Sequence, residues 1–80
     1  MPHPIGVVLG SGARIGDRVS IYQGVTVGAN RRGQYPVIEF GVTLYPGSSV
    51  TGGVRVGAGA LIGAGARIYD DVPAGATIRG

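Results

Sequence analysis

The sequence predicts an all-β fold, a parallel β-helix whose coils are triangular. Three observations support this prediction. Large aliphatic residues recur every six positions, a smaller apolar residue usually follows four positions later, and 17 of the 80 residues are glycine. A period of six fits neither the 3.6-residue repeat of an α-helix nor the alternation of a long strand. Short internal repeats are typical of a β-solenoid, in which each hexad forms one side of a coil.

The large aliphatic positions form two series with six-residue spacing. The first series is His3, Leu9, Ile15, Ile21 and Val27, and the second is Ile38, Leu44, Val50, Val56, Ile62, Ile68 and Ala74. We expect these side chains to fill the interior, with smaller residues keeping the cross-section from being overfilled. The smaller residues are Val7, Ala13, Val19, Val25, Val42, Ser48, Val54, Ala60, Ala66, Val72 and Ile78.

Three hexads close one triangular coil, so residues three hexads apart are expected to stack in columns. About four coils result, separated by the ~4.8 Å spacing of neighbouring strands. Glycines relieve the backbone at the tight corners between sides. The predicted columns are Ile21 with Leu44 and Ile62, Val27 with Val50 and Ile68, and Ile15 with Ile38, Val56 and Ala74.

The repeat is interrupted once, between Val27 and Ile38, where eleven residues replace six. The inserted segment is polar, contains Arg31 and Arg32, and ends near Pro36. Such a segment predicts a loop, at about residues 28–37, that projects from the coil. Loops on a rigid scaffold often carry binding function.

Composition excludes several classes of site. The chain has no cysteine, which rules out disulfides and thiolate metal sites, and a single histidine, which rules out a three-imidazole zinc site within one chain. No apolar segment approaches the ~20 residues of a membrane-spanning helix.

The charge balance is positive, with seven arginines and no lysine against four acidic residues. The charges are scattered singly, which indicates a solvated surface. We therefore expect a single cytoplasmic β-helix domain over residues 1–80, without a metal, nucleic-acid or membrane partner.

Three segments give the chain a more specific resemblance. They are His3-Pro4-Ile5-Gly6-Val7-Val8-Leu9-Gly10, then Val19-Ser20-Ile21-Tyr22-Gln23-Gly24-Val25-Thr26-Val27-Gly28 followed by the loop and Tyr35-Pro36-Val37-Ile38, and finally Asp70-Asp71-Val72-Pro73. Together they resemble the serine acetyltransferase branch of the hexapeptide-repeat acyltransferases. The resemblance covers essentially the whole chain and implies a left-handed β-helix, an exception to the usual right-handed crossover. The upstream helical domain of serine acetyltransferases is expected to be absent.

The resemblance also implies an acetyl-CoA-dependent O-acetyltransferase in which His3 is the general base. An imidazole suits this role because it exchanges a proton near neutral pH. By the same resemblance, CoA lies along a groove between neighbouring prisms of a homotrimer. The corner residues that match the family's CoA contacts are Gly28, Ala29, Pro46 and Ala64.

Two departures from the family pattern affect the acceptor. Pro2 precedes His3 where the family has an aspartate, and Gln34-Tyr35-Pro36 replaces the Arg-His-Pro that binds the amino acid. Gln34 lacks the charge and the fork with which arginine binds a carboxylate. The acceptor hydroxyl therefore belongs to serine or to a sugar. A noncatalytic or truncated β-helix module, serving assembly or ligand binding, is the alternative.

Overall fold

The computed structural model describes residues 8–10 and 12–80, and these form only short strands and turns. Within this part of the chain, no helix could cross a membrane. Eleven strands occur among these residues. They are β1 (Val8–Leu9), β2 (Arg14–Ile15), β3 (Ser20–Ile21), β4 (Thr26–Gly28), β5 (Val37–Ile38), β6 (Thr43–Leu44), β7 (Ser49–Thr51), β8 (Arg55–Val56), β9 (Leu61–Ile62), β10 (Arg67–Ile68) and β11 (Thr77–Ile78).

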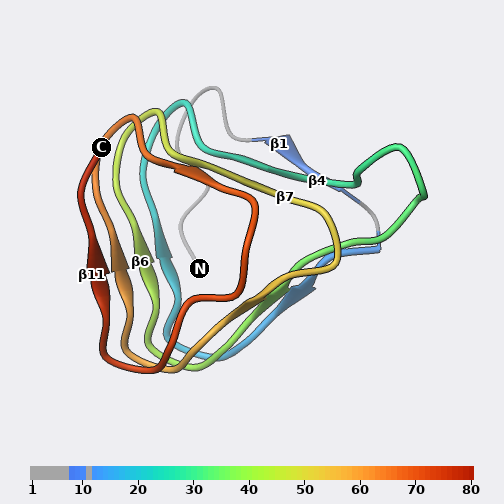
Figure 1. Cartoon of the computed structure of the whole chain (residues 1–80). Helices are drawn as coiled ribbons and strands as arrows, with labels where there is room; N and C mark the ends of the chain where they lie inside the picture. The colour runs from blue at the N-terminus through green and yellow to red at the C-terminus, as the bar shows by residue number, and fades with distance from the viewer. Residues whose placement is uncertain (1–7, 11) are drawn as a thin grey trace.

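The strands form three parallel sheets, one on each side of a triangular prism (Figure 1). Sheet A has the order β1-β4-β7-β10, sheet B has β2-β5-β8, and sheet C has β11-β9-β6-β3. Neighbours within a sheet come from successive coils, as the register Ile21↔Leu44↔Ile62 illustrates. The predicted fold of about four stacked triangular coils is confirmed.

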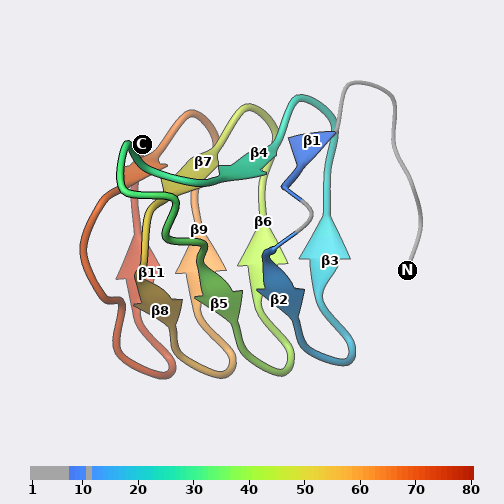
Figure 2. The ribbon, with the colours of Figure 1, turned by 90° about the vertical axis from the view of Figure 1, so that its right-hand side faces the viewer.

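The coils wind in the left-handed sense. In Figure 1 the chain runs clockwise, from sheet C on the left through sheet A at the top and sheet B at the lower right. The C-terminal coil lies in front of the others, and Figure 2 shows the coils stacked from the N-terminal to the C-terminal end. A chain that advances toward the viewer while turning clockwise forms a left-handed helix. The handedness expected from the resemblance is therefore confirmed.

The prism interior is a continuous apolar core made by the large aliphatic positions and the smaller positions of the repeat. The second residue of most strands points inward, and the smaller residue that begins the next side also points inward. The polar exception among the buried side chains is Ser48. Fully buried examples are Val27, Leu44, Val50, Val56 and Ile62 among the large aliphatic positions, and Val25, Val42 and Ala60 among the smaller positions.

The last coil departs from the predicted spacing. Ala74 is exposed and does not stack over Val56, so that part of the prediction is wrong. Val56 instead forms a parallel bridge with Val72, and Ile62 pairs with Ile78. Both separations are sixteen residues instead of eighteen. The final coil is thus two residues shorter than the hexad pattern predicts.

Asp71 explains the shortening. Its Oδ1 accepts a hydrogen bond of 2.9 Å from the N–H of Arg55. In regular coils the equivalent N–H donates to a backbone carbonyl, as Val37 does to Val54. The carboxylate of Asp71 replaces that carbonyl, so the chain leaves the regular register at this corner. The N–H of Val72 then donates to the carbonyl of Arg55 at 2.9 Å and restores the pairing.

Candidate functional site

The edges of the prism are formed by stacked corners, and the predicted site residues lie on two of these edges. Edge 1, between sheets C and A, stacks the corners 22–25, 45–48 and 63–66. Edge 2, between sheets A and B, includes the projecting loop and the corner 52–54. Pro46 and Ala64 lie on edge 1, whereas Gly28 and Ala29 lie at the start of the loop on edge 2. The four residues therefore do not form one cluster on a single chain.

On edge 1, hydrogen bonds between successive coils hold the corners in register. The N–H of Gly47 donates to the carbonyl of Gln23 at 3.0 Å, and the N–H of Gly65 donates to the carbonyl of Pro46 at 3.0 Å. Ala64 is exposed, and its N–H donates no backbone hydrogen bond among the described residues. Pro46 has no N–H to offer. At the corner 63–66, edge 1 thus presents only small side chains and a backbone donor at Ala64.

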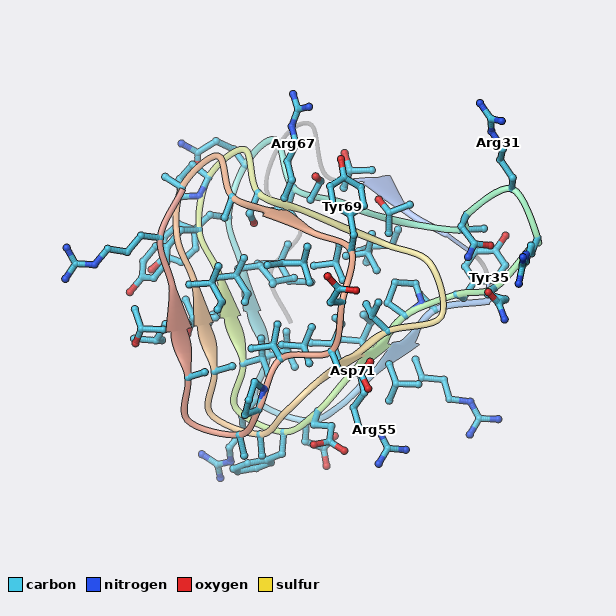
Figure 3. All side chains as sticks on the ribbon, in the orientation of Figure 1. Arg31, Tyr35, Arg55, Arg67, Tyr69 and Asp71 are labelled. Atoms are coloured by element: carbon cyan, nitrogen blue, oxygen red, sulfur yellow. The ribbon has the colours of Figure 1, made fainter. Side chains whose placement is uncertain are left out.

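On edge 2, the loop between β4 and β5 projects from the prism (Figure 2), and the side chain of Asn30 organises it. The Oδ1 of Asn30 accepts hydrogen bonds from the N–H of Arg32 at 2.9 Å and from the N–H of Gln34 at 3.1 Å. The N–H of Gly33 donates to the carbonyl of Asn30 at 3.0 Å, and Gly33 has a positive φ of 74°. Glycine adopts this left-handed conformation without the steric cost that a side chain brings. The loop is therefore a closed turn that directs Arg31 away from the prism (Figure 3).

Gln34, predicted on the substrate side of the loop, is engaged within the loop. Its Oε1 accepts a hydrogen bond of 2.9 Å from the Nδ2 of Asn30. Its side chain also lies against Gly53 in the following coil. The Oε1 of Gln34 is consequently engaged by Asn30, and the exposed side chain keeps its Nε2 as a hydrogen-bond donor.

Tyr35, the other predicted loop residue, has its ring packed across Gly10 and Gly12 of the preceding coil. A Cβ at either glycine would collide with the ring. The side chain is half-buried at the base of the loop (Figure 3). Tyr35 thus anchors the loop to the coil that leads from β1 to β2. The predicted general base, His3, lies outside the described residues.

A separate polar cluster secures the shortened last coil. The Nε of Arg55 lies 3.6 Å from the Oε2 of Glu39, and the Oε1 of Glu39 accepts a hydrogen bond of 3.2 Å from the N–H of Ala58. With Asp71, these side chains border an open pocket of about 290 Å³. Among the site residues that were predicted from the sequence and lie in the described part of the chain, none lines that pocket.

Sequence reasoning overlooked two features of the site. One is Asn30, whose place ahead of a glycine three residues later is a typical turn signal. The other is an aromatic pair on edge 1, where the rings of Tyr22 and Tyr45 stack with centroids 5.3 Å apart and an interplanar angle of 26°. Both tyrosines directly follow a large aliphatic residue of the repeat, so their shared register could have predicted the contact.

Comparison with known proteins agrees with this architecture. Residues 35–70 match the bacterial transferase hexapeptide (six repeats) family. Serine acetyltransferase of Staphylococcus xylosus is 40% identical over 98% of this chain, which spans 38% of that protein. A solved serine acetyltransferase in complex with cysteine matches 94% of this chain with a TM-score of 0.90 and 36% identity. Another, in complex with CoA, matches 94% with a TM-score of 0.86 and 37% identity.

A left-handed prism with six-residue sides and a turn-closed loop on one edge defines a hexapeptide-repeat protein, and the chain belongs to the hexapeptide-repeat transferase family. Within that family it is similar to the β-helix of serine acetyltransferases. It covers only 30% of the two solved chains.

Proposed function

We propose that the chain is the β-helix of an acetyl-CoA-dependent O-acetyltransferase that acts on a serine or sugar hydroxyl. The observation that supports this most directly is the similarity of nearly the whole chain to a serine acetyltransferase solved in complex with CoA. Edge 1 adds a physical argument. The small residues of its corner 63–66 and the N–H of Ala64, which donates no backbone hydrogen bond among the described residues, suit the close approach of a flexible pantetheine arm to the backbone.

In the proposed reaction, His3 removes the proton from the acceptor hydroxyl as its oxygen attacks the thioester carbonyl. The tetrahedral intermediate collapses with cleavage of the C–S bond, and the imidazolium returns the proton to the CoA thiolate. Backbone N–H groups at a coil corner are the proposed donors to the oxyanion. The role of His3 rests on the resemblance of its sequence segment.

The proposed CoA groove requires a second chain. Gly28 and Ala29 lie on edge 2, whereas Pro46 and Ala64 lie on edge 1, so one ligand reaches both pairs only where edges of two prisms adjoin. A parallel homotrimer brings edge 1 of each chain beside edge 2 of a neighbour. Burial between subunits would also stabilise a chain of 80 residues, which has a small core.

The acceptor is proposed to be recognised through hydroxyl groups. Gln34 has no charge with which to bind a carboxylate and is already paired with Asn30. The same pairing favours the alternative function, a noncatalytic module that binds CoA or supports assembly without turnover. Both candidate functions use the prism and edge 1, and only the transferase carries out acetyl transfer.

A thiol-release assay separates the two candidates. Acetyl-CoA is incubated with serine or with each of a panel of sugars, and free CoA is measured for the parent chain and for His3→Ala. We expect turnover with at least one acceptor and a loss of at least about 100-fold in the variant. Equal rates in the two proteins would refute the role of His3. CoA binding by calorimetry without turnover would establish the noncatalytic module.

A further inference from the structure

The shortening of the last coil leaves a recess on the sheet B side of the prism. In Figure 1 the last coil, drawn in orange to red, runs inside the outline of the coil behind it on this side. The open pocket of about 290 Å³ lies here, between Arg55 of β8 and the segment 71–74. The recess therefore exists because the chain takes a shorter path past β8.

The backbone fixes the apolar wall of the recess. The N–H of Val72 donates to the carbonyl of Arg55 at 2.9 Å, and the N–H of Gly57 donates to the carbonyl of Val72 at 2.8 Å. A Cβ at Gly57 would lie 2.6 Å from the Cα of Ala74, so the chain at Pro73 and Ala74 packs directly on this glycine. The side chains of Pro73 and Ala74 are exposed. A wall that is already ordered lowers the entropic cost of binding.

Three charged side chains border the recess, and two of them keep hydrogen-bonding capacity. Glu39 is engaged on both oxygens, since its Oε1 accepts the N–H of Ala58 at 3.2 Å and its Oε2 lies 3.6 Å from the Nε of Arg55. Arg55 has further N–H donors on its two Nη atoms. The Oδ1 of Asp71 accepts the N–H of Arg55 at 2.9 Å, and its Oδ2 has no hydrogen-bond partner among the described residues. The recess thus offers a forked donor beside a carboxylate oxygen (Figure 3).

We propose that this recess binds a free α-amino acid with a small aliphatic side chain. Such a ligand carries a carboxylate, which an arginine binds in a bidentate manner, and an ammonium group for the Oδ2 of Asp71. Its side chain lies against Pro73 and Ala74. A volume of about 290 Å³ is at the small end for ligand pockets, so the ligand is a small molecule.

Both charges are needed on the ligand. An anion alone leaves Asp71 without a partner and brings a negative charge beside it. An amine alone leaves the Arg55 fork without a partner. The proposal does not rest on acetyl transfer, because none of the proposed CoA contacts lines the recess.

Amide NMR on the full chain tests the site with three probes. L-Valine carries both charges, N-acetylvaline carries only the carboxylate, and valinamide carries only the ammonium group. We expect valine to shift the amide signals of Arg55, Gly57 and Val72, and to leave those of Gly47 and Gly65 on edge 1 in place. We also expect valine to bind at least about tenfold more tightly than either other probe, because each of these lacks one charge-assisted hydrogen bond.

Two variants with matched controls test the residues. Asp71→Asn keeps an oxygen for the N–H of Arg55 and removes the charge, and its control is the neighbouring Asp70→Asn. Arg55→Gln removes the fork, and its control is Arg14→Gln, because Arg14 lies at the same register of sheet B two coils away. We expect the first variant of each pair to weaken valine binding about tenfold and each control to change it less than about twofold. Circular dichroism verifies that each variant keeps the fold.

The outcomes separate this site from the proposed function. If valine shifts no amide around the recess, or if the three probes bind equally, the amino-acid site is refuted. Equal losses within either pair of variants also refute it, because they indicate a general effect of charge. If valinamide alone matches valine, the recess binds amines and the amino-acid proposal is overturned. A chain that binds valine here and releases no CoA keeps this site and loses the transferase proposal.

Discussion

Replacing Leu44 by alanine tests which side chains of sheet C point into the core and which point outward. Leu44 is fully buried and lies between Ile21 and Ile62 in the central part of the core. The substitution removes three carbons, which is about 2.4 kcal/mol of transfer free energy at ~0.8 kcal/mol each. The cavity left among stiff neighbouring coils adds roughly 1 kcal/mol or more. We therefore expect the free energy of unfolding to fall by about 3–4 kcal/mol.

This loss is large for so small a chain. At roughly 0.05–0.15 kcal/mol per residue, 80 residues correspond to a total of about 4–12 kcal/mol. Urea unfolding followed by far-UV circular dichroism measures the effect. The matched control is Leu61→Ala, because Leu61 begins the neighbouring strand β9, points outward and is 37% exposed. We expect the control to cost less than about 1 kcal/mol. Equal losses for Leu44 and Leu61 would refute the assigned faces.

Three further predictions concern polar groups. Ser48→Ala should raise the free energy of unfolding by about 1 kcal/mol, because the buried Ser48 Oγ has no partner among the described residues; a lower urea midpoint would contradict this. Asp71→Ala should lower the melting temperature by several degrees and Asp70→Ala should not, because only Asp71 accepts the N–H of Arg55; equal shifts in calorimetry would contradict the account of the shortened coil. Asn30→Ala should make trypsin cleave after Arg31 severalfold faster, since three side-chain hydrogen bonds of the loop are lost. Mass spectrometry of timed digests measures the cleavage rate, and an unchanged rate would contradict the loop structure.

Much of the fold could be predicted because the repeat is local. Each hexad needs one large and one smaller inward residue, so columns such as Val27 with Val50 and Ile68 follow from counting. The prediction failed at Ala74 because counting assumes that every side has six residues. A carboxylate can take the place of a ladder carbonyl, as Asp71 does, and spacing alone does not reveal such a hydrogen bond.

The candidate site was less predictable for a related reason. The sequence indicated the loop and the corner positions, but it could not show that the side chain of Gln34 pairs with Asn30 or that Tyr35 covers two glycines. These contacts join residues of different coils or opposite sides of a turn. They depend on where a side chain finds space after the coils have stacked, which the repeat does not specify.

By itself, the sequence determined the β-helix, its three sides, the position of the loop and the family resemblance, because these depend on a periodic pattern of side-chain size and on local turn residues. The tertiary structure alone decided the shortened last coil, the closed loop and the register that places Arg79 beside Gly63. Stacking brings residues far apart in the sequence within one strand spacing of each other. The chemistry of this protein's edges therefore depends on the alignment of successive coils.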